Sequence, residues 1–254
     1  MPEKWVNIVK EQCPDSFICT IPQGEPSKCF DQYKNLLEEM ISHNMSRKDA
    51  IIAVGGGVVG DLAGFVAASY MRGIDFYNIP TTVLSQVDSS VGGKVAIDMG
   101  SYKNIVGAFW QPKTVIIDPN VLSTLSLRQQ HNGLCEALKM GLILDDHLVS
   151  LFEQETIDID AIITRSIELK RDVVQQDERE SNLRKILNFG HTIGHAIESA
   201  YGLNTYLHGE CVAMGMLFFI EDKTLKQRVL NIYKKLDLPQ VPNYDTSTLL
   251  EYVT

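Results

Sequence analysis

The feature that most constrains this chain is a change of pattern near residue 122. Up to that point, short apolar β-type runs alternate with helix-type segments, and beyond it only helix-type periodicity continues. Strands that alternate with helices are typical of a mostly parallel sheet with helices packed on it. We therefore expect an α/β domain with a mostly parallel sheet over residues 1–124, followed by an all-α domain over residues 125–254.

These patterns place the expected elements on the sequence. In the first half, β-type runs lie at residues 17–21, 50–54, 76–79 and 114–118, and helical patterns lie at 27–43 and 61–70. Ser27 is the expected N-cap of the first helix, because its hydroxyl can accept from a free helical amide. In the second half, helical periodicity covers residues 128–144, 157–176, 183–201, 208–222 and 225–236.

Composition and charge argue against several classes of protein. The formal net charge is −9 and no block of lysine and arginine occurs, so a nucleic-acid partner is not expected. No apolar run approaches the roughly 20 residues of a membrane span, so no membrane partner is expected. The charged N-terminal segment has no signal-peptide core. Five cysteines without CxxC spacing indicate reduced thiols and a cytoplasmic protein.

A glycine-rich segment follows the apolar run at residues 50–54 and precedes a helical pattern. Residues 55–60 read GGGVVG, which fits G-x-G-x-x-G in the strand–loop–helix context of a Rossmann-like nucleotide site. Such glycines let the chain turn tightly and approach a pyrophosphate at the helix N-terminus. Asp61 would lie in the first helical turn, where the helix dipole favours a carboxylate. The alternative is a turn whose glycines serve close packing alone.

Small polar and cationic residues follow the next β-type run. Thr81 and Thr82 come directly after it, so their hydroxyls would lie at the carboxyl edge of the sheet. Residues 86–94, QVDSSVGGK, form a second glycine-rich turn that ends in a lysine, a reasonable phosphate cradle. Lys103 and Asn104 add further donors. For each lysine taken alone, surface solubility is the competing explanation.

A stripe of four polar residues stands out in the second half of the chain. On an α-helix their spacings of 4, 3 and 4 would place them all on one face: Arg184, Asn188, His191 and His195. Gly190 and Gly194 would let another backbone or a ligand approach closely. Two imidazoles, an amide and a guanidinium suggest an anion or metal site. An ordinary exposed face with two incidental histidines is the alternative.

A carboxylate and a further histidine extend this set. Glu136 lies in an apolar context, where a carboxylate needs a partner or a metal, and Lys139 shares its helix face. His208 opens the next helix. Together with one stripe histidine, Glu136 and His208 would offer the three ligands of a catalytic metal site with an open position. Cys135 and Cys211 are possible competing ligands, but buried small side chains are the favoured reading.

Several blocks of this sequence resemble the 3-dehydroquinate synthase family. The blocks occur in the family's order and run from about residue 21 to the C-terminus: GGGVVGDLAGFVAASYMRG, IPTTVLSQVDSSVGGKVAID, KNIVGAFWQP, GLCEALKMGLI, NFGHTIGHAIE and LHGECVAMGM. DSSVGGK and NFGHTIGHAIE are the most specific of them.

The resemblance implies an activity and its requirements. The family uses NAD and a divalent metal, zinc or cobalt, to convert 3-deoxy-D-arabino-heptulosonate 7-phosphate into 3-dehydroquinate and phosphate. The steps are transient oxidation, phosphate elimination, reduction and aldol closure, in the biosynthesis of aromatic amino acids by the shikimate pathway. The partners implied are this phosphorylated sugar acid and a second copy of the chain in a homodimer.

The resemblance also assigns site residues. The metal ligands would be Glu136, His191 and His208. The catalytic group would be His195, which handles protons and contacts phosphate, with Glu180 as a proton acceptor, Lys139 and Lys94. The substrate contacts would be Arg72 (donated to the neighbouring subunit), Asp88, Lys94, Asn104, Lys139, Lys170, Arg184, Asn188 and His195. The NAD contacts would be Glu25, Lys28, Gly56, Gly57, Val58, Asp61, Thr81, Thr82, Lys103 and Thr124.

The chain departs from the family pattern at both ends. Members usually begin with another strand and helix that contact the adenosine ribose, and they continue to a lysine-rich segment near the substrate phosphate. Tyr102 stands where the family commonly has glycine. We therefore expect weaker NAD binding and a site open at one side. The alternatives are a related sugar-phosphate cyclase, a metal-dependent polyol dehydrogenase and a fragment that binds metal without turnover.

Overall fold

The computed structural model describes residues 3–100, 102–201 and 205–240. The chain divides into two compact units, Met1–Leu125 and Ser126–Thr254, which are described separately below.

The first unit is built around a three-stranded parallel sheet in the order β1-β2-β5. The pairing β1–β2 runs from Ala50 opposite Asp75 to Gly55 opposite Pro80, so both strands end at the same edge. The described elements of this unit are α1 (Glu3–Gln12), α2 (Phe30–Ser42), β1 (Ala50–Gly55), α3 (Gly57–Ser69), β2 (Asp75–Pro80), β3 (Lys94–Met99), β4 (Tyr102–Phe109) and β5 (Thr114–Val115).

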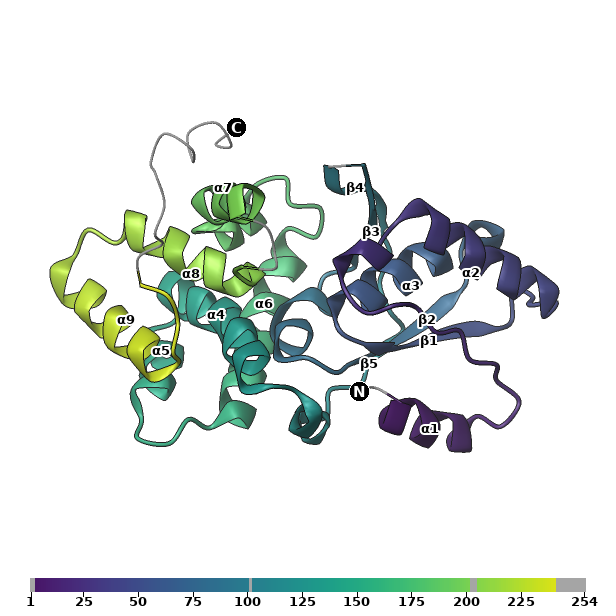
Figure 1. Cartoon of the computed structure of the whole chain (residues 1–254), viewed down its shortest axis with the longest axis horizontal. Helices are drawn as coiled ribbons and strands as arrows, with labels where there is room; N and C mark the ends of the chain where they lie inside the picture. Colours follow the sequence, from purple (N-terminus) through teal and green to yellow (C-terminus); the bar gives the residue numbers. More distant parts are fainter. Residues whose placement is uncertain (1–2, 101, 202–204, 241–254) are drawn as a thin grey trace. The chain divides into compact units, whose positions relative to one another are not determined.

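An antiparallel hairpin of β3 and β4 adds a second layer to this unit. Helix α3 lies between the hairpin and the parallel sheet (Figure 1). Leu62 and Val66 of α3 are buried with Phe76 of β2 and with Val95 and Ile97 of β3 in one apolar core. The hairpin therefore completes the core that the sheet alone leaves open.

The expected parallel sheet is confirmed, but two of its expected strands change. Residues 17–21 form no strand; the Phe17 ring instead stacks on His43 with ring centroids 3.8 Å apart. The strand expected at 114–118 is two residues long. Asp118 ends the extended segment because its carboxylate accepts from the Asn120 amide and caps the 3-10 helix that follows.

Two helix starts also differ from expectation. Helix α2 begins at Phe30, and Ser27 is not its N-cap: the Ser27 hydroxyl donates to the Pro22 carbonyl at 2.6 Å. Helix α3 begins at Gly57, so Asp61 lies beyond the first helical turn. Gly60 lies within this helix. A β-carbon at Gly60 would lie 3.1 Å from the Asn78 side chain, so glycine lets the helix pack closely on β2. Gly60 thus serves close packing within the helix, whereas it was expected in the loop before the helix.

The second unit consists of helices joined by loops, with no strand among its described residues. Helix α8 lies at its centre (Figure 1), buried from Gly209 to Leu217 on every side, which fits its almost wholly apolar sequence. The elements are α4 (Leu127–Leu144), α5 (Asp146–Glu153), α6 (Ile159–Gln176), the 3-10 helix η5 (Leu183–Asn188), α7 (His191–Tyr201), α8 (His208–Phe219) and α9 (Lys223–Lys235). Helix α5 was not expected; Arg228 of α9 joins it through Asp146 and Glu153.

The helix expected over residues 183–201 is wrong as a single element. The chain forms a 3-10 helix to Asn188, turns at Phe189 and Gly190, and starts α7 at His191. Gly190 has φ +77°, a left-handed conformation that glycine adopts without strain. The four stripe residues therefore occupy two helices and share no single helix face.

Glycines set the distance between α7 and α8. A β-carbon on Gly194 would lie 3.1 Å from the Cys211 carbonyl oxygen, and one on Gly215 would lie 2.1 Å from the Gly190 carbonyl oxygen. The expected close approach of a backbone at Gly190 and Gly194 is confirmed, and the approaching backbone is α8. No helix among the described residues is long and apolar enough to cross a membrane.

Gly215→Ala should destabilise the protein by about 3 kcal/mol, because the added methyl group overlaps backbone that cannot rotate away. Gly100→Ala is the matched control: its β-carbon meets no atom within 4 Å, and its φ of +62° leaves only backbone strain of about 1 kcal/mol. Chemical denaturation measures both. Equal denaturation midpoints for the two variants would contradict the close contact.

Candidate metal centre and nucleotide loop

Three side chains of the second unit converge from three helices. The Oε1 atom of Glu136, on α4, lies 3.9 Å from Nε2 of His191 and 3.7 Å from Nε2 of His208. The two histidines are the first residues of α7 and α8, so the glycine contacts between these helices also set the distance between the imidazoles. Glu136 is 1% exposed. This geometry brings together the three expected metal ligands.

The far side of each imidazole is oriented by a hydrogen-bond acceptor. Nδ1 of His191 lies 3.2 Å from the Phe189 carbonyl oxygen, and Nδ1 of His208 lies 3.3 Å from Oε2 of Glu198. A proton on each Nδ1 leaves the lone pair of Nε2 free on the side that faces Glu136, where it can bind a metal. Glu198 was not among the expected site residues, although it ends the NFGHTIGHAIE block.

The two imidazoles differ in charge preference. Burial lowers the pKa of His191 to about 4, so its ring is neutral near pH 7. Burial also opposes the charged form of His208, but the hydrogen bond to Glu198 and the charges of Glu136 and Glu198 outweigh it and raise the pKa. A metal ligand must be neutral imidazole, and the site supplies both rings with Nε2 turned inward.

This donor set fits a divalent metal. Ligand atoms of a tetrahedral zinc site lie about 3.4 Å apart, close to the two distances from Glu136 Oε1. The ligand nitrogens of His191, His195 and His208 lie within 4.8 Å of one another, so His195 borders the same space. Cys135 and Cys211 are fully buried, and burial raises the pKa of Cys135 well above its usual value. The prediction that these thiols pack as small apolar groups is confirmed.

The helical unit buries three cationic side chains, one of which contacts this centre. Lys139 is 2% exposed, and its ammonium is paired with Oε2 of Glu136. Lys170 of α6 and Arg184 of η5 are buried as well. Arg184 Nη1 donates to the Glu178 carbonyl oxygen at 2.6 Å. These three residues were expected as substrate contacts, and the helical unit holds each of them largely away from solvent.

A tight loop sets the position of η5. The Asp177 carboxylate accepts from the backbone amides of Arg184, Asn182 and Ser181, and these bonds hold its pKa well below the usual range. Glu180 has φ +56° in this loop, and its Oε1 accepts from Asn188 Nδ2 at 3.2 Å. The structure thus pairs two expected site residues that lie eight positions apart. Asp177 had no sequence signal beyond being a carboxylate in a polar loop.

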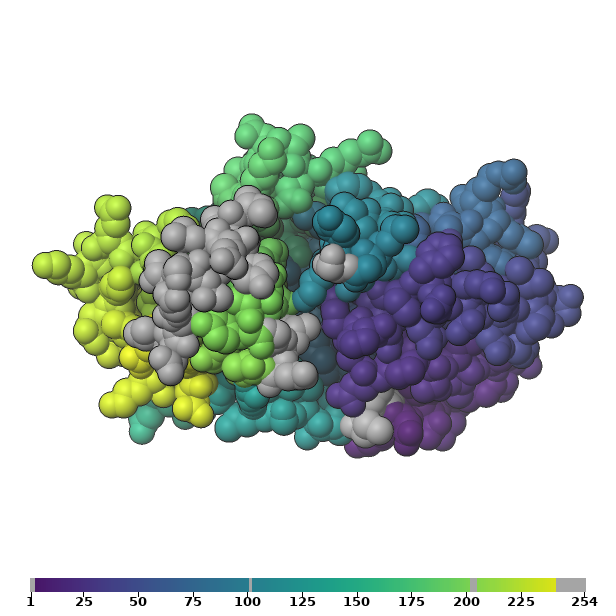
Figure 2. Space-filling view, turned by 45° about the horizontal axis from the view of Figure 1, so that its top comes forward, coloured from purple at the N-terminus to yellow at the C-terminus, as the bar shows by residue number. Residues whose placement is uncertain are grey.

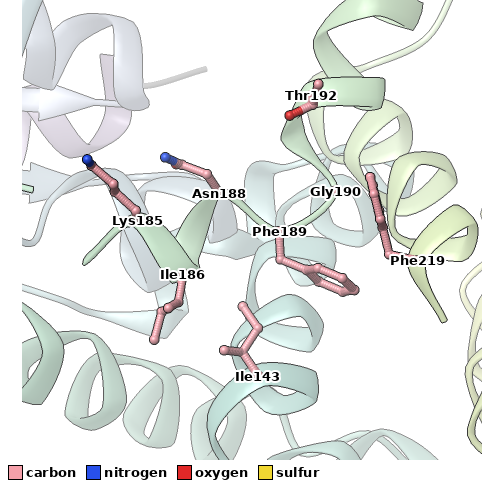
Figure 3. Close-up of a pocket in the computed structure, with 8 residues that line it drawn as sticks. All are labelled: Ile143, Lys185, Ile186, Asn188, Phe189, Gly190, Thr192 and Phe219. Carbon is pink, nitrogen blue, oxygen red and sulfur yellow. The ribbon is translucent and has the colours of Figure 1, made fainter. Parts of the chain in front are cut away.

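A hollow opens beside the break between η5 and α7 (Figure 3). Asn188 and Lys185 point away from the Phe189 ring, whereas the opposite side is apolar. Its lining residues are Ile143, Lys185, Ile186, Asn188, Phe189, Gly190, Thr192 and Phe219.

In the first unit, the glycine loop has the expected strand–loop–helix setting. Gly56 caps α3 without a side-chain hydrogen bond. A β-carbon on Gly56 would lie 3.0 Å from the Thr82 methyl group, and one on Gly57 would lie 3.1 Å from the Ser89 hydroxyl. The Thr81 amide donates to the Gly55 carbonyl at 2.8 Å. The loop therefore packs against the two threonines, which is also the packing role left open by the sequence.

A buried lysine of this unit contacts several carboxylates and an amide. Lys28 is 4% exposed, and its Nζ lies 2.8 Å from Glu25 Oε1, 3.2 Å from Asp61 Oδ2 and 2.7 Å from Asn104 Oδ1. Three expected NAD contacts and one expected substrate contact thus form one cluster. Asp98 was missed: it lies 4.0 Å from Lys28 and accepts from the Asn104 amide at 2.8 Å.

A β-bulge and an unusual backbone place Asn104 in this cluster. The register of the hairpin shifts between Ile97 and Met99, and Asn104 has φ +55°. Bulges commonly redirect a side chain beside functional sites. The hairpin was not expected: residues 86–94 and Lys103–Asn104 were considered for phosphate binding, and no strand was assigned to residues 94–109.

The other expected site residues of the first unit lie on several different elements. Arg72 and Thr124 are exposed, and Arg72 has φ +69°. Lys94 and Lys103 are exposed at the starts of β3 and β4. Val58 lies in the first turn of α3, and Asp88 is half-buried in the π-helical segment η3 (Ser85–Ser89).

Comparison with known proteins finds the same family over both halves of the chain. A family model described as 3-dehydroquinate synthase N-terminal matches residues 18–132, and one described as 3-dehydroquinate synthase C-terminal matches residues 133–254. The 3-dehydroquinate synthase of Caldanaerobacter subterraneus subsp. tengcongensis is 51% identical over 236 residues, which cover 86% of this chain and 66% of that protein. The chain spans 66 to 71% of the length of the curated relatives it matches first.

Solved structures of related cyclases have the same fold. A 2-deoxy-scyllo-inosose synthase complexed with carbaglucose-6-phosphate, NAD+ and Co2+ superposes with a TM-score of 0.88 at 29% identity, covering 100% of this chain and 74% of that one. The 2-epi-5-epi-valiolone synthase ValA of Streptomyces hygroscopicus subsp. jinggangensis, with NAD+ and Zn2+ bound, gives 0.86 at 26% identity, covering 98% and 78%.

The Asp61 carboxyl should titrate near pH 6, because burial raises its pKa above 3.8 to about 6 against the opposing charge of Lys28. The folded protein then holds the proton more tightly than the unfolded chain, so the contribution of Asp61 to stability falls as pH rises from about 4 to 6. Lys28→Met should raise this pKa further. Carbon NMR of labelled aspartates measures it.

Lys113→Met is the matched control for that titration. Lys113 pairs with Asp75 on the surface at 3.4 Å, and its loss should leave the Asp61 titration unchanged. An Asp61 carboxyl that titrates below pH 4 in the wild type would show that the cluster is not buried as described.

Proposed function

The chain belongs to the 3-dehydroquinate synthase family, and on that premise we propose that it converts 3-deoxy-D-arabino-heptulosonate 7-phosphate into 3-dehydroquinate and phosphate. The convergence of Glu136 Oε1 on the Nε2 atoms of His191 and His208 carries the proposal, at 3.9 and 3.7 Å. Dependence on NAD and a divalent metal, and classification as a carbon–oxygen lyase, are parts of the same proposal.

The cofactors are assigned to different units. NAD would be held by the glycine loop and the Lys28 cluster, and the metal by Glu136, His191 and His208. The solved cyclases with bound NAD+ and Co2+ or Zn2+ support this choice of cofactors. When bound, NAD would supply a reversible oxidation and the metal would polarise the oxygen at the oxidised carbon as a Lewis acid.

The residues around the metal centre suit an anionic, phosphorylated substrate. Lys139 offsets the charge of Glu136, while Lys170 and Arg184 provide buried cations for carboxylate and phosphate oxygens. His195 borders the same space as the metal ligands and can transfer a proton there. Asn188 holds the Glu180 carboxylate, the proposed proton acceptor, at 3.2 Å.

A homodimer is a further part of the proposal. The hairpin lies at the surface of the first unit, in teal in Figure 2. Its Tyr102 and Ile105 are 69% and 63% exposed, and Met99 and Phe109 are exposed as well. Several exposed large apolar side chains on one hairpin favour a protein–protein interface there. All five cysteines are free thiols, which supports a reducing, cytoplasmic compartment.

His191→Ala, His208→Ala and Glu136→Ala should each lower phosphate release by about 1,000-fold, the equivalent of about 4 kcal/mol, because a two-ligand site holds the metal poorly. Phosphate release from the heptulosonate phosphate, assayed with NAD and zinc or cobalt, measures this. His43→Ala is the control, since its imidazole stacks on Phe17 in the other unit.

A substrate panel decides between the members of this fold. Release of phosphate from another sugar phosphate alone would favour a related cyclase. Net accumulation of NADH with simple alcohols would instead favour a polyol dehydrogenase. Full activity in His191→Ala would contradict the assignment of the metal centre.

Ile105→Asp should convert a dimer into monomers, because a charge on the outer face of β4 cannot be buried without a partner. Sedimentation velocity measures the change in mass. Ile18→Asp is the matched control, since Ile18 is 50% exposed in an irregular segment and should leave the dimer intact. Dimers that persist in Ile105→Asp would place the interface elsewhere.

A further inference from the structure

The carboxylate of Glu198 has a position that the proposed chemistry does not use directly. It lies on α7, seven residues after His191, and is 8% exposed. Its Oε2 lies 3.3 Å from Nδ1 of His208, which belongs to α8. A buried carboxylate is costly unless it is paired with a hydrogen-bond donor or a cation. The contact from α7 to the His208 imidazole on α8 therefore provides the partner that this carboxylate needs.

The ring of His208 has two possible neutral tautomers, and Glu198 selects between them. An acceptor at Nδ1 places the proton on that nitrogen and leaves the Nε2 lone pair free. Nε2 is the atom that lies 3.7 Å from Glu136 Oε1. The Nε2 edge of the ring is thereby turned toward Glu136.

His191 follows the same arrangement with a different acceptor. Its Nδ1 lies 3.2 Å from the Phe189 backbone carbonyl, and its Nε2 faces Glu136 Oε1 at 3.9 Å. A backbone carbonyl provides a neutral acceptor, whereas Glu198 provides an ionised one. Charged partners of this kind raise the basicity of a ligating imidazole.

We propose that Glu198 is a positioning residue, which holds His208 in the tautomer and ring orientation that present Nε2 to a divalent metal. The inference rests on the proposed metal centre of Glu136, His191 and His208. It adds a fourth residue, which would act through His208.

Zinc affinity of the metal-free full chain tests this proposal, measured by competition with a chromophoric chelator. Glu198→Ala should weaken zinc binding by about 10- to 100-fold, the usual effect of losing an outer-sphere carboxylate. Glu198→Gln keeps an acceptor but loses the charge, so its affinity should fall by about 10-fold. Glu155→Gln, an exposed carboxylate of the same unit, should bind zinc as the wild type does.

Two further readouts separate positioning from a structural role. The thermal midpoint of metal-free Glu198→Gln should match the wild type while its zinc affinity falls. In the zinc-loaded wild type, nitrogen-resolved NMR should show a slowly exchanging proton on Nδ1 of His208, and Glu198→Ala should lose it.

The outcomes distinguish this inference from the proposed function. Wild-type zinc affinity in Glu198→Ala, or in Glu198→Gln if the alanine variant does not fold, would overturn the role of Glu198 provided that His191→Ala still abolishes binding. A wild type that binds no zinc, or a His191→Ala variant that binds it normally, would instead overturn the proposed metal centre itself.

Discussion

The close approach of α7 to α8 is the constraint on which the metal centre depends. Gly194 and Gly215 bring the backbones together where any side chain would meet main-chain atoms. His191 and His208 begin these two helices, so their separation follows from that contact. Helix α4 packs on α8 as well and adds Glu136 from a third direction. The proposed ligands are thus placed by helix packing, and Phe189 and Glu198 orient the two imidazoles.

In both units a charged lysine side chain is buried. Each buries a lysine against carboxylates: Lys139 with Glu136 in the helical unit, and Lys28 with Glu25 and Asp61 in the α/β unit. Burying a charge is costly unless it is paired. These pairs keep cations inside an acidic protein with a net charge of −9. The charge of each buried lysine is therefore offset by carboxylates of its own unit.

The sequence predicted the parallel sheet and the setting of the glycine loop, and the family resemblance predicted the three side chains that the helical unit brings together. Its failures have physical causes. The stripe of residues 184–195 has the spacing of one α-helix, but the chain forms a 3-10 helix to Asn188 and leaves helical geometry at Phe189 and at the left-handed Gly190. The β3–β4 hairpin was missed because the buried alternation of Val95 and Ile97 is short and most of β4 is exposed. Glu198 and Asp98 act through other residues, so no motif chemistry marked them.

The most direct test of this account is the position of the bound metal, located by anomalous scattering in crystals of the zinc- or cobalt-loaded protein. The account predicts a single ion bonded to Oε1 of Glu136 and to Nε2 of His191 and His208, at about 2.0–2.2 Å. An ion held by His195 in place of Glu136, by a cysteine sulfur, or outside the contact between α7 and α8 would contradict it.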